Sequence, residues 1–328
     1  MAEKKIGRVT ERRPLSPVLE IFRVAPEPGG AFPAYRSGQY MALSRENCKL
    51  TRKEIGADGS VNYVYDQDEA GNIRRGAITH SYSIASAPFE TERDGYVEFY
   101  IVLELIRTAT PGRLSESIFS IDPDSDSSLL YVNKIVGEFT LERRATGFEN
   151  VVLVGTGTGL APFASMMKQA DHDAREGKGR NQRFTLLHTN RTAGELGYHE
   201  ELCAIERAQK IDFAYLPTIT RPSPAEPTTN APGRGRANNV LRTVFGLPIK
   251  EEEDLRLARA GGEDGRREEE LLRKALVPVL PGGHERGALS ERMTPGKTVI
   301  MTCGNPHLMA DIRHIAQLME IAFEQEEW

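Results

Sequence analysis

A glycine-rich stretch behind four apolar residues is the first place where this sequence could do chemistry. It reads VVLVGTGTGLAP over residues 151–162 and lacks the Gly-Lys-Ser/Thr ending of a nucleoside triphosphate loop. A glycine turn between a buried strand and a helix lets backbone N–H groups approach a pyrophosphate at the positive end of the helix. A tight turn without a ligand has the same pattern, so both interpretations stay open at this point.

A second candidate is the stretch HSYSIASAP at residues 80–88. An aromatic ring followed by a hydroxyl on a strand edge can stack on a flat ligand ring while the hydroxyl hydrogen-bonds to it. Tyr82 and Ser83 have these types. The alternative is an ordinary strand with Tyr82 and Ile84 packed inward.

Arginines and a cysteine follow the expected strands of the second half. Arg191, Arg221, Arg234 and Arg236 lie in loops after apolar segments, where a planar guanidinium fork would suit a dianionic phosphate. The alternative is that these arginines are only solvated loop residues. Cys303, in CGNP, comes at a strand end, where α/β sheets bind ligands, but could also be a small buried apolar residue.

The elements that must position these residues change character near residue 150. Up to about Arg144 the chain has short β-rich segments broken by Gly, Pro and Asp, which predict an antiparallel Greek-key barrel or sandwich. From Asn150 apolar strands alternate with helical patterns, which predicts a parallel α/β domain. We expect two domains, 1–146 and 147–328.

One segment interrupts the second pattern. Residues 250–276 are densely charged, with two helical pieces on either side of Gly261 and Gly262, inside an excursion near 250–294. A solvated surface excursion is favoured over a partner-binding arm.

Bulk composition limits the class of protein. The 328 residues carry a net charge of −5, which argues against a general nucleic-acid binder. Three scattered cysteines fit a reducing compartment and cannot form a four-cysteine cluster, so no metal site is expected. Without an apolar leader or a run of about 20 apolar residues, we expect a cytoplasmic protein with no membrane span.

Taken in order, these motifs resemble the plant-type ferredoxin-NADP reductase family, in its bacterial-like, FAD-containing form. The matching stretches are HSYS (80–83), PGRLS (111–115), GTGTGLAP (155–162), HTNR (188–191), ELGYHEEL (195–202), TITR (218–221) and CGNP (303–306). The resemblance covers nearly the whole chain except the excursion and an extra hairpin-like piece near residues 48–77. It implies an FAD-binding barrel at 1–146 and an NADP-binding α/β domain at 147–328.

The resemblance also implies the flavin contacts. Tyr82 would stack on the isoalloxazine, Ser83 would hydrogen-bond near flavin N5 as a catalytic residue, and the EFYIV strand would line the ring. His80 replaces the family arginine on the FAD pyrophosphate, which implies weaker or pH-dependent FAD retention. The residues expected around FAD are His80, Tyr82, Ser83, Phe99, Tyr100, Ile101, Val102, Arg113, Leu114 and Ser115.

For the coenzyme, the resemblance places Cys303 beside the nicotinamide as the second catalytic residue. Trp328, the C-terminal residue, would cover either the flavin ring or the FAD adenine, or else lie frayed in solvent. The resemblance places the arginines where the family binds the adenosine 2′-phosphate, which favours NADP; if they are only solvated loop residues, NAD becomes the alternative. The residues expected around NADP are Gly155, Gly157, Thr158, Gly159, Pro162, Asn190, Arg191, Thr220, Arg221, Arg236, Gly304, Asn305 and Pro306.

The function that the resemblance implies is a ferredoxin-NADP reductase. Hydride would pass between NADPH and FAD, and single electrons between FAD and a ferredoxin or flavodoxin partner. Two alternatives stay open: a reductase of the same fold serving an oxygenase or a quinone or flavin acceptor, and a non-catalytic electron-transfer subunit.

Overall fold

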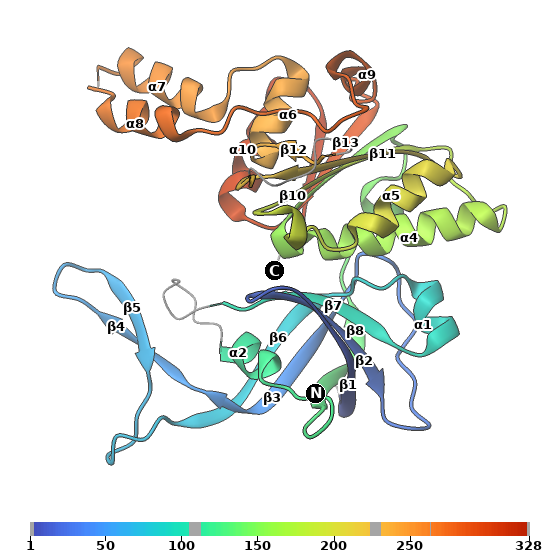
Figure 1. Cartoon of the computed structure of the whole chain (residues 1–328), viewed down its shortest axis with the longest axis vertical. Helices are drawn as coiled ribbons and strands as arrows, with labels where there is room; N and C mark the ends of the chain where they lie inside the picture. The colour runs from blue at the N-terminus through green and yellow to red at the C-terminus, as the bar shows by residue number, and fades with distance from the viewer. Residues whose placement is uncertain (1–2, 105–112, 224–230, 263, 327–328) are drawn as a thin grey trace. The chain divides into compact units, whose positions relative to one another are not determined.

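The computed structural model describes residues 3–104, 113–223, 231–262 and 264–326 (Figure 1). The chain divides into two compact units between Glu138 and Phe139. The boundary expected between residues 146 and 147 thus falls inside the second unit. None of the helices in the described ranges is long and apolar enough to span a membrane.

The first unit is a curled antiparallel sheet. Among its described residues six strands pair in the order β6-β3-β8-β1-β2-β7, so β8 inserts between β1 and β3 instead of following an up-and-down order. Ile84, just after β6, bridges to Phe99 of β7, which brings the two edges of the sheet together. The elements are β1 (Lys4–Ser16), β2 (Leu19–Pro26), β3 (Tyr40–Lys49), β6 (Arg75–Ser83), α1 (Pro88–Asp94), β7 (Val97–Val102), α2 (Arg113–Phe119) and β8 (Ser128–Val136).

The curled sheet encloses one apolar core. Phe22, Met41, Leu43, Phe99 and Tyr131 point into one buried cluster, which the helix α2 closes with further apolar side chains. Between β3 and β6, the strands β4 (Thr51–Ile55) and β5 (Val61–Tyr65) form a separate hairpin that projects from the barrel (Figure 1). This is the extra hairpin expected near residues 48–77.

The second unit is a parallel sheet. Its described strands follow the order β12-β11-β10-β9-β13-β14, with every pairing parallel. The helices α4 and α5 cover one face, and α6 and α10 cover the other (Figure 1). The elements are α3 (Leu141–Arg144), β9 (Asn150–Thr156), η1 (Gly157–Leu160), α4 (Ala161–Arg175), β10 (Arg183–Asn190), η2 (Ala193–Glu195), α5 (His199–Ala208), β11 (Asp212–Ile219), β12 (Gly233–Arg234), α6 (Ala237–Phe245), β13 (Thr298–Cys303), α10 (Pro306–Leu318) and β14 (Ala322–Gln325).

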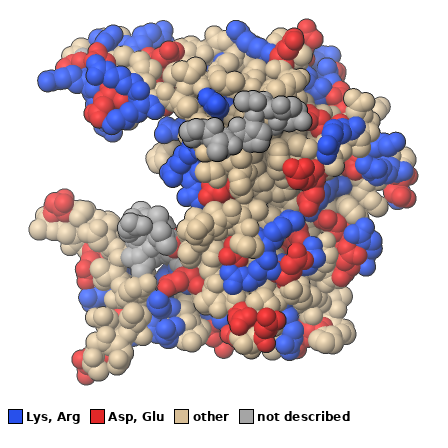
Figure 2. Space-filling model, viewed as in Figure 1, with Lys and Arg blue, Asp and Glu red and all other residues tan. Residues whose placement is uncertain are grey.

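The charged excursion forms helices, as its sequence predicts. α7 (Lys250–Ala260) and α8 (Arg266–Lys274) pack on each other, and α9 (Arg286–Glu291) follows them. Positive and negative side chains are interspersed over α7 and α8 on the face shown in Figure 2. The two predicted classes of fold, an antiparallel barrel-like sheet followed by a parallel α/β unit, are therefore both confirmed.

Candidate functional site

The glycine loop lies where the strand order of the parallel sheet reverses. The chain runs outward from β9 through β10 and β11 on one side, and returns with β13 on the other. Gly155, at the end of β9, is in register with His188 of β10 and with Cys303 of β13. The carboxyl ends of strands at such a reversal are the usual ligand site of an open α/β sheet.

Close backbone contacts explain two of the glycines at this reversal. A Cβ on Gly159 would lie 2.2 Å from the carbonyl oxygen of Cys303. Gly304 has φ +127°, and a Cβ there would lie 2.2 Å from the Thr156 hydroxyl oxygen. The Asn305 N–H donates to that same Thr156 hydroxyl at 2.9 Å. The two loops therefore form one backbone unit that has no room for side chains at these positions.

The helix after the glycine loop presents its N-terminus without a side-chain cap. α4 begins after η1, carries Pro162 in its first turn, and has no acidic residue there. Thr158 lies half-buried in η1. By contrast, α10 is capped by Asn305, whose side-chain oxygen accepts from the N–H groups of His307 and Leu308. The uncapped end of α4 is the one suited to an anionic group.

Cys303 is fully buried and hydrogen-bonded. Its Sγ–H donates to Glu326 Oε2 at 2.9 Å, and only 3% of Glu326 is exposed. Burial and then the nearby Glu326 carboxylate raise the pKa of the Cys303 thiol well above its ordinary value. The group at this position is therefore a neutral thiol.

Carboxylates occupy part of the expected phosphate site at the ends of β10 and β11. Arg191 forms a two-pronged ion pair with Glu195, with Nε–Oε2 at 2.9 Å and Nη2–Oε1 at 2.6 Å. Asn190 is buried, and its amide donates to the Glu195 backbone carbonyl. Backbone bonds bring the neighbouring residues together, because Thr220 N–H donates to Asn190 O and Arg221 N–H to Arg191 O.

The remaining arginines follow on the next strands. Arg221 is exposed and has no ion pair with any described residue, and the same holds for Arg234 in β12. Arg236 precedes α6 and forms an ion pair with Glu251 of α7 at 3.4 Å. The structure thus brings the predicted arginines to one edge, two of them paired with acids.

Behind this edge lies a buried polar cluster. His188 is fully buried, its Nδ1 lies 3.0 Å from the Tyr215 hydroxyl, and its Nε2 has no partner among the described residues. His199 reaches the same hydroxyl at 3.3 Å. Burial and then the neighbouring His199 lower the pKa of His188 to about 3, so this ring is neutral. Within the described ranges, no three His, Cys, Asp or Glu side chains are placed to hold a metal ion.

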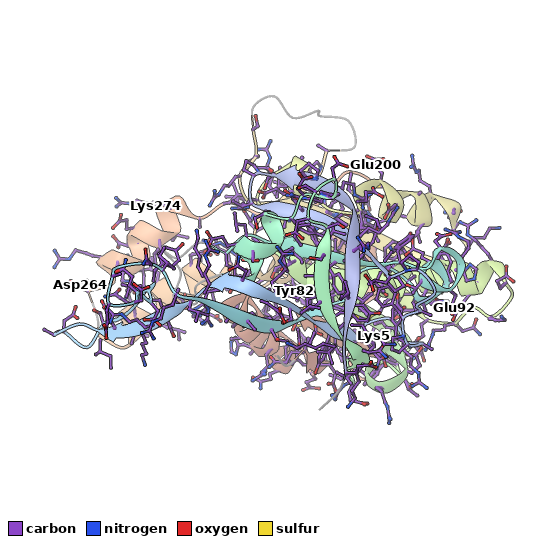
Figure 3. The ribbon with its side chains drawn as sticks, turned by 90° about the horizontal axis from the view of Figure 1, so that it is seen from below. Lys5, Tyr82, Glu92, Glu200, Asp264 and Lys274 are labelled. Atoms are coloured by element: carbon purple, nitrogen blue, oxygen red, sulfur yellow. The ribbon has the colours of Figure 1, made fainter. Side chains whose placement is uncertain are left out.

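In the first unit, the predicted flavin residues lie at the meeting of β6 and β7. Tyr82, labelled in Figure 3, is half-buried, and its ring lies edge-on to the Phe99 ring with 6.5 Å between the ring centroids. Ser83 is 6% exposed. Phe99 and Ile101 belong to the barrel core, whereas Tyr100 is buried outside that cluster and Val102 is half-buried.

Basic groups of the predicted pyrophosphate site come together beside α2. Arg113 Nε is buried without a partner among the described residues. Burial and then the positive Arg113 lower the pKa of His80, so its imidazole is neutral at pH 7. Leu114 is buried in the core, and the Ser115 hydroxyl accepts from the Glu104 N–H at 3.1 Å. Pro111, Gly112 and Trp328 lie outside the described residues.

Four residues of these arrangements were missed from the sequence: Thr156, Glu195, Glu251 and Glu326. Thr156 follows the buried strand directly, and a hydroxyl among glycines could have drawn attention to it. Glu326 stands among several acids in EQEEW, and nothing in that pattern distinguishes it from Glu324 or Glu327. Glu195 lies four residues after Arg191, so spacing could have suggested this pair, whereas Glu251 reaches Arg236 only through the packing of α7.

Comparison with known protein families gives a match to part of the second unit. Residues 153–254 match the family described as the oxidoreductase NAD-binding domain. This range includes most of the glycine loop and the arginine edge. Among curated proteins, a sequence search finds no match.

The fold of the whole chain is shared with several flavoprotein reductases. A ferredoxin NADP+ reductase from Neisseria gonorrhoeae with bound FAD and NADP is 18% identical, with 99% of each chain covered and a TM-score of 0.57. The FAD/NAD-binding domain of nitric oxide dioxygenase from Vibrio cholerae is 14% identical, with 99% of this chain and 98% of that one covered and a TM-score of 0.59. The cytochrome b5 reductase domain of Ulva prolifera nitrate reductase is 14% identical, with 98% and 97% covered and a TM-score of 0.56.

Proposed function

We propose that this protein is an FAD-containing NADPH reductase that exchanges hydride with NADPH and single electrons with a ferredoxin or flavodoxin. The observation that carries the proposal is the close approach of Gly159 to Cys303 and Gly304 at the strand reversal. Beside this contact, Gly157 has nothing within 4 Å of the position of a Cβ, and it leads into the uncapped helix α4 within the range matched to the NAD-binding domain. Backbone of this kind suits a dinucleotide pyrophosphate.

The first unit has groups that fit FAD. The buried, unpartnered Nε of Arg113 is a donor that a pyrophosphate oxygen would satisfy. Tyr82 is partly buried against the barrel core and is followed by the nearly buried Ser83, and an aromatic ring next to a hydroxyl suits a flat ring with hydrogen-bonding nitrogens. When bound, FAD supplies the hydride acceptor and the capacity to pass electrons singly.

The second unit would orient the nicotinamide coenzyme. Gly155, Gly157, Thr158, Gly159 and Pro162 would face its pyrophosphate, and Arg221 and Arg234 its 2′-phosphate. Cys303 would lie beside the nicotinamide as a neutral thiol, held by its hydrogen bond to Glu326. A neutral group there excludes water and adds no charge that would oppose hydride transfer.

A second candidate function comes from the different kinds of enzyme that share this fold. The three similar structures come from a ferredoxin NADP+ reductase, a nitric oxide dioxygenase and a nitrate reductase, which are three enzymes with different overall reactions. A reductase for an oxygenase or for a quinone is therefore the second candidate. A non-catalytic subunit is the third.

The test is an anaerobic titration of the purified protein with NADPH and then NADH, followed by its visible spectrum. We expect flavin absorbance that bleaches at a much lower concentration of NADPH than of NADH. The reduced protein should then transfer electrons to added ferredoxin or flavodoxin. A colourless protein that also fails to take up FAD would contradict the proposal. Bleaching without transfer to either carrier, but with transfer to a quinone, would favour the second candidate.

A variant pair tests the flavin site itself. Arg113→Gln removes the proposed pyrophosphate donor, and we expect its FAD dissociation constant to rise roughly tenfold or more, because hydrogen bonds to charged groups are the strong ones. Arg93→Gln is the control, since Arg93 is exposed on α1 and pairs with Asp94. Equal FAD affinity in both variants would remove Arg113 from the site.

A further inference from the structure

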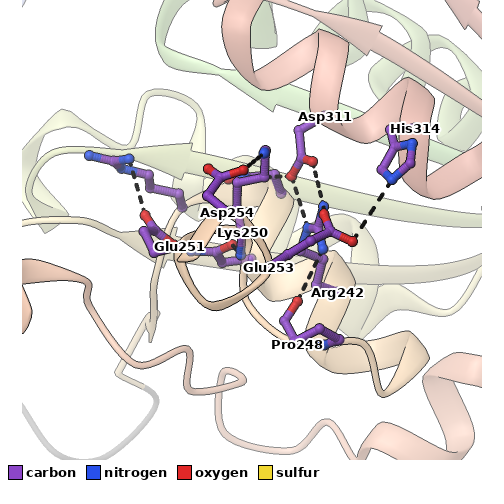
Figure 4. Close-up of polar contacts among 11 residues, drawn as sticks. Arg242, Pro248, Lys250, Glu251, Glu253, Asp254, Asp311 and His314 are labelled. Carbon is purple, nitrogen blue, oxygen red and sulfur yellow. Dashed lines mark hydrogen bonds and ion pairs between the residues drawn. The ribbon is translucent and has the colours of Figure 1, made fainter. Parts of the chain in front are cut away.

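The excursion is fixed to the nucleotide-binding unit by a buried charge network. Arg242 of α6 is fully buried and binds Asp311 of α10 at 2.6 Å and Glu253 of α7 at 2.7 Å (Figure 4). Its Nη1 also donates to the Pro248 carbonyl at 3.1 Å. Removing one partner of such a network leaves a buried charge uncompensated, so the first turns of α7 hold a defined position.

The same part of α7 supplies a carboxylate to the start of α6. Glu251 Oε2 accepts from the Asn239 amide at 2.7 Å, while its Oε1 contacts Arg236 at 3.4 Å. The Lys250 N–H donates to the other side of the Asn239 amide at 2.8 Å. The Glu251 side chain is 12% exposed, whereas the Arg236 side chain is 62% exposed. Glu251 is therefore a nearly buried charge held by Asn239, and Arg236 is its mostly exposed partner.

This carboxylate faces the arginine edge of the parallel sheet. β12 pairs with β11 so that Arg234 is in register with Ile219, and the Gly235 N–H donates to the Ile219 carbonyl. Arg236 comes two residues after the end of β12, and Thr220 and Arg221 come directly after the end of β11. Because these two strand ends are paired, we place Arg236 close to Thr220 and Arg221. A ligand phosphate at that edge would meet the Glu251 charge as well as the arginines.

We propose that Glu251 is a specificity-determining residue that weakens binding of the phosphorylated coenzyme relative to NADH. The inference rests on the proposed function, because it takes the arginine edge as the adenosine end of the coenzyme site. A fixed carboxylate cancels the positive charge of Arg236 and repels a dianion, while a ribose without the 2′-phosphate is little affected. The excursion thereby takes part in coenzyme choice.

The test is Glu251→Gln, which keeps an acceptor for Asn239 and removes the charge. We expect the ratio of kcat/KM for NADPH to that for NADH to rise roughly three- to tenfold, as for a partly exposed charge pair. The gain should shrink with added salt, which a structural effect would not do. Glu270→Gln is the matched control, because Glu270 is exposed on α8 and pairs only with Lys274 among the described residues.

Calorimetry with 2′,5′-ADP and 5′-AMP gives a readout that needs no turnover. The Gln variant should bind 2′,5′-ADP more tightly and 5′-AMP unchanged. An unchanged ratio of the two affinities would overturn the inference, and so would weaker 2′,5′-ADP binding, which would mean that Glu251 holds Arg236 for the phosphate. If the wild type oxidises neither coenzyme, the proposed function fails, while this binding comparison still tests Glu251.

Discussion

At the carboxyl edge of the parallel sheet, the side formed by β9 and β13 depends on backbone contacts, whereas the side formed by β10, β11 and β12 depends on charged side chains. On the loop side, β9 and β13 meet through backbone, with Gly159 against Cys303 and Gly304 against Thr156. On the arginine side, β10, β11 and β12 carry charged side chains, two of which are held by Glu195 and Glu251. Shape is therefore fixed tightly on the loop side, whereas charge on the arginine side is adjusted by residues from other segments.

This difference predicts where a small change has a large effect. The contact of Gly159 with Cys303 and Gly304 cannot yield without moving the two loops apart, because the nearest atoms on the far side are all backbone. A charge on the arginine side acts through space and is partly screened by solvent. Substitutions should thus cost more on the loop side.

The largest effect is expected from Gly159→Ala. Its new Cβ would lie 2.2 Å from the Cys303 carbonyl oxygen and 2.7 Å from the Gly304 Cα, so both loops must separate. We expect a loss of about 3 kcal/mol in unfolding free energy by urea titration. Displacement of the Cys303 segment by about 1 Å should also lower kcat on the order of a hundredfold.

Gly157→Ala is the matched control for that change. Gly157 has φ +57° but nothing within 4 Å of its added Cβ. Only the left-handed conformation opposes alanine there, at about 1 kcal/mol. If the two alanine variants lose equal stability, the tight backbone contact is not what the loop side depends on.

The same contrast explains what could be read from the sequence. Glycine spacing reports local backbone geometry, so the loop motif and the alternation of strands and helices predicted the fold correctly. The pairing of Arg191 with Glu195 is local, because the two residues are four positions apart. The partner of Arg236 is an acid on another helix, and sequence spacing does not specify that contact. The Cys303–Glu326 hydrogen bond joins residues of two different strand ends and was equally out of reach.

A second prediction concerns the support beneath the arginine side. His188 on β10 has its pKa lowered from 6.5 to about 3 by burial and by His199. Between these values the unfolded chain binds the proton and the folded one does not, so stability falls as the pH drops below about 6.5. From pH 7.5 to 5.0 the His188 contribution should be a loss of about 2 kcal/mol.

Urea unfolding of His188→Phe at both pH values measures this contribution. Phenylalanine cannot titrate, so the variant should lose about 2 kcal/mol less than the wild type over that interval, whatever its stability at pH 7.5. His307→Gln, at an exposed histidine, serves as the control. An equal pH dependence in wild type and His188→Phe would contradict the buried neutral histidine.

The smallest effects should separate the arginines from one another. Arg221 has no ion pair with a described residue, so its guanidinium is available to a 2′-phosphate. Arg221→Gln should therefore raise the KM for NADPH about tenfold, which corresponds to about 1.4 kcal/mol of binding free energy, with little change in the KM for NADH. Arg191 already uses two donors on Glu195, which is 5% exposed. Arg191→Gln should therefore lower the free energy of unfolding by about 1 kcal/mol, because a nearly buried carboxylate loses its two hydrogen bonds from Arg191.

Steady-state kinetics with both coenzymes and urea unfolding of both variants distinguish these roles, with Arg207→Gln on α5 as a control for the loss of one positive charge. If Arg221→Gln alters stability and Arg191→Gln alters only the KM for NADPH, the assignment is reversed, and Glu195 must release Arg191 when the coenzyme binds. The pairing seen here would then be a resting arrangement that phosphate displaces. If instead the expected pattern holds, the two arginines have different roles: Arg221 binds the ligand, and the Arg191–Glu195 pair stabilises the loop.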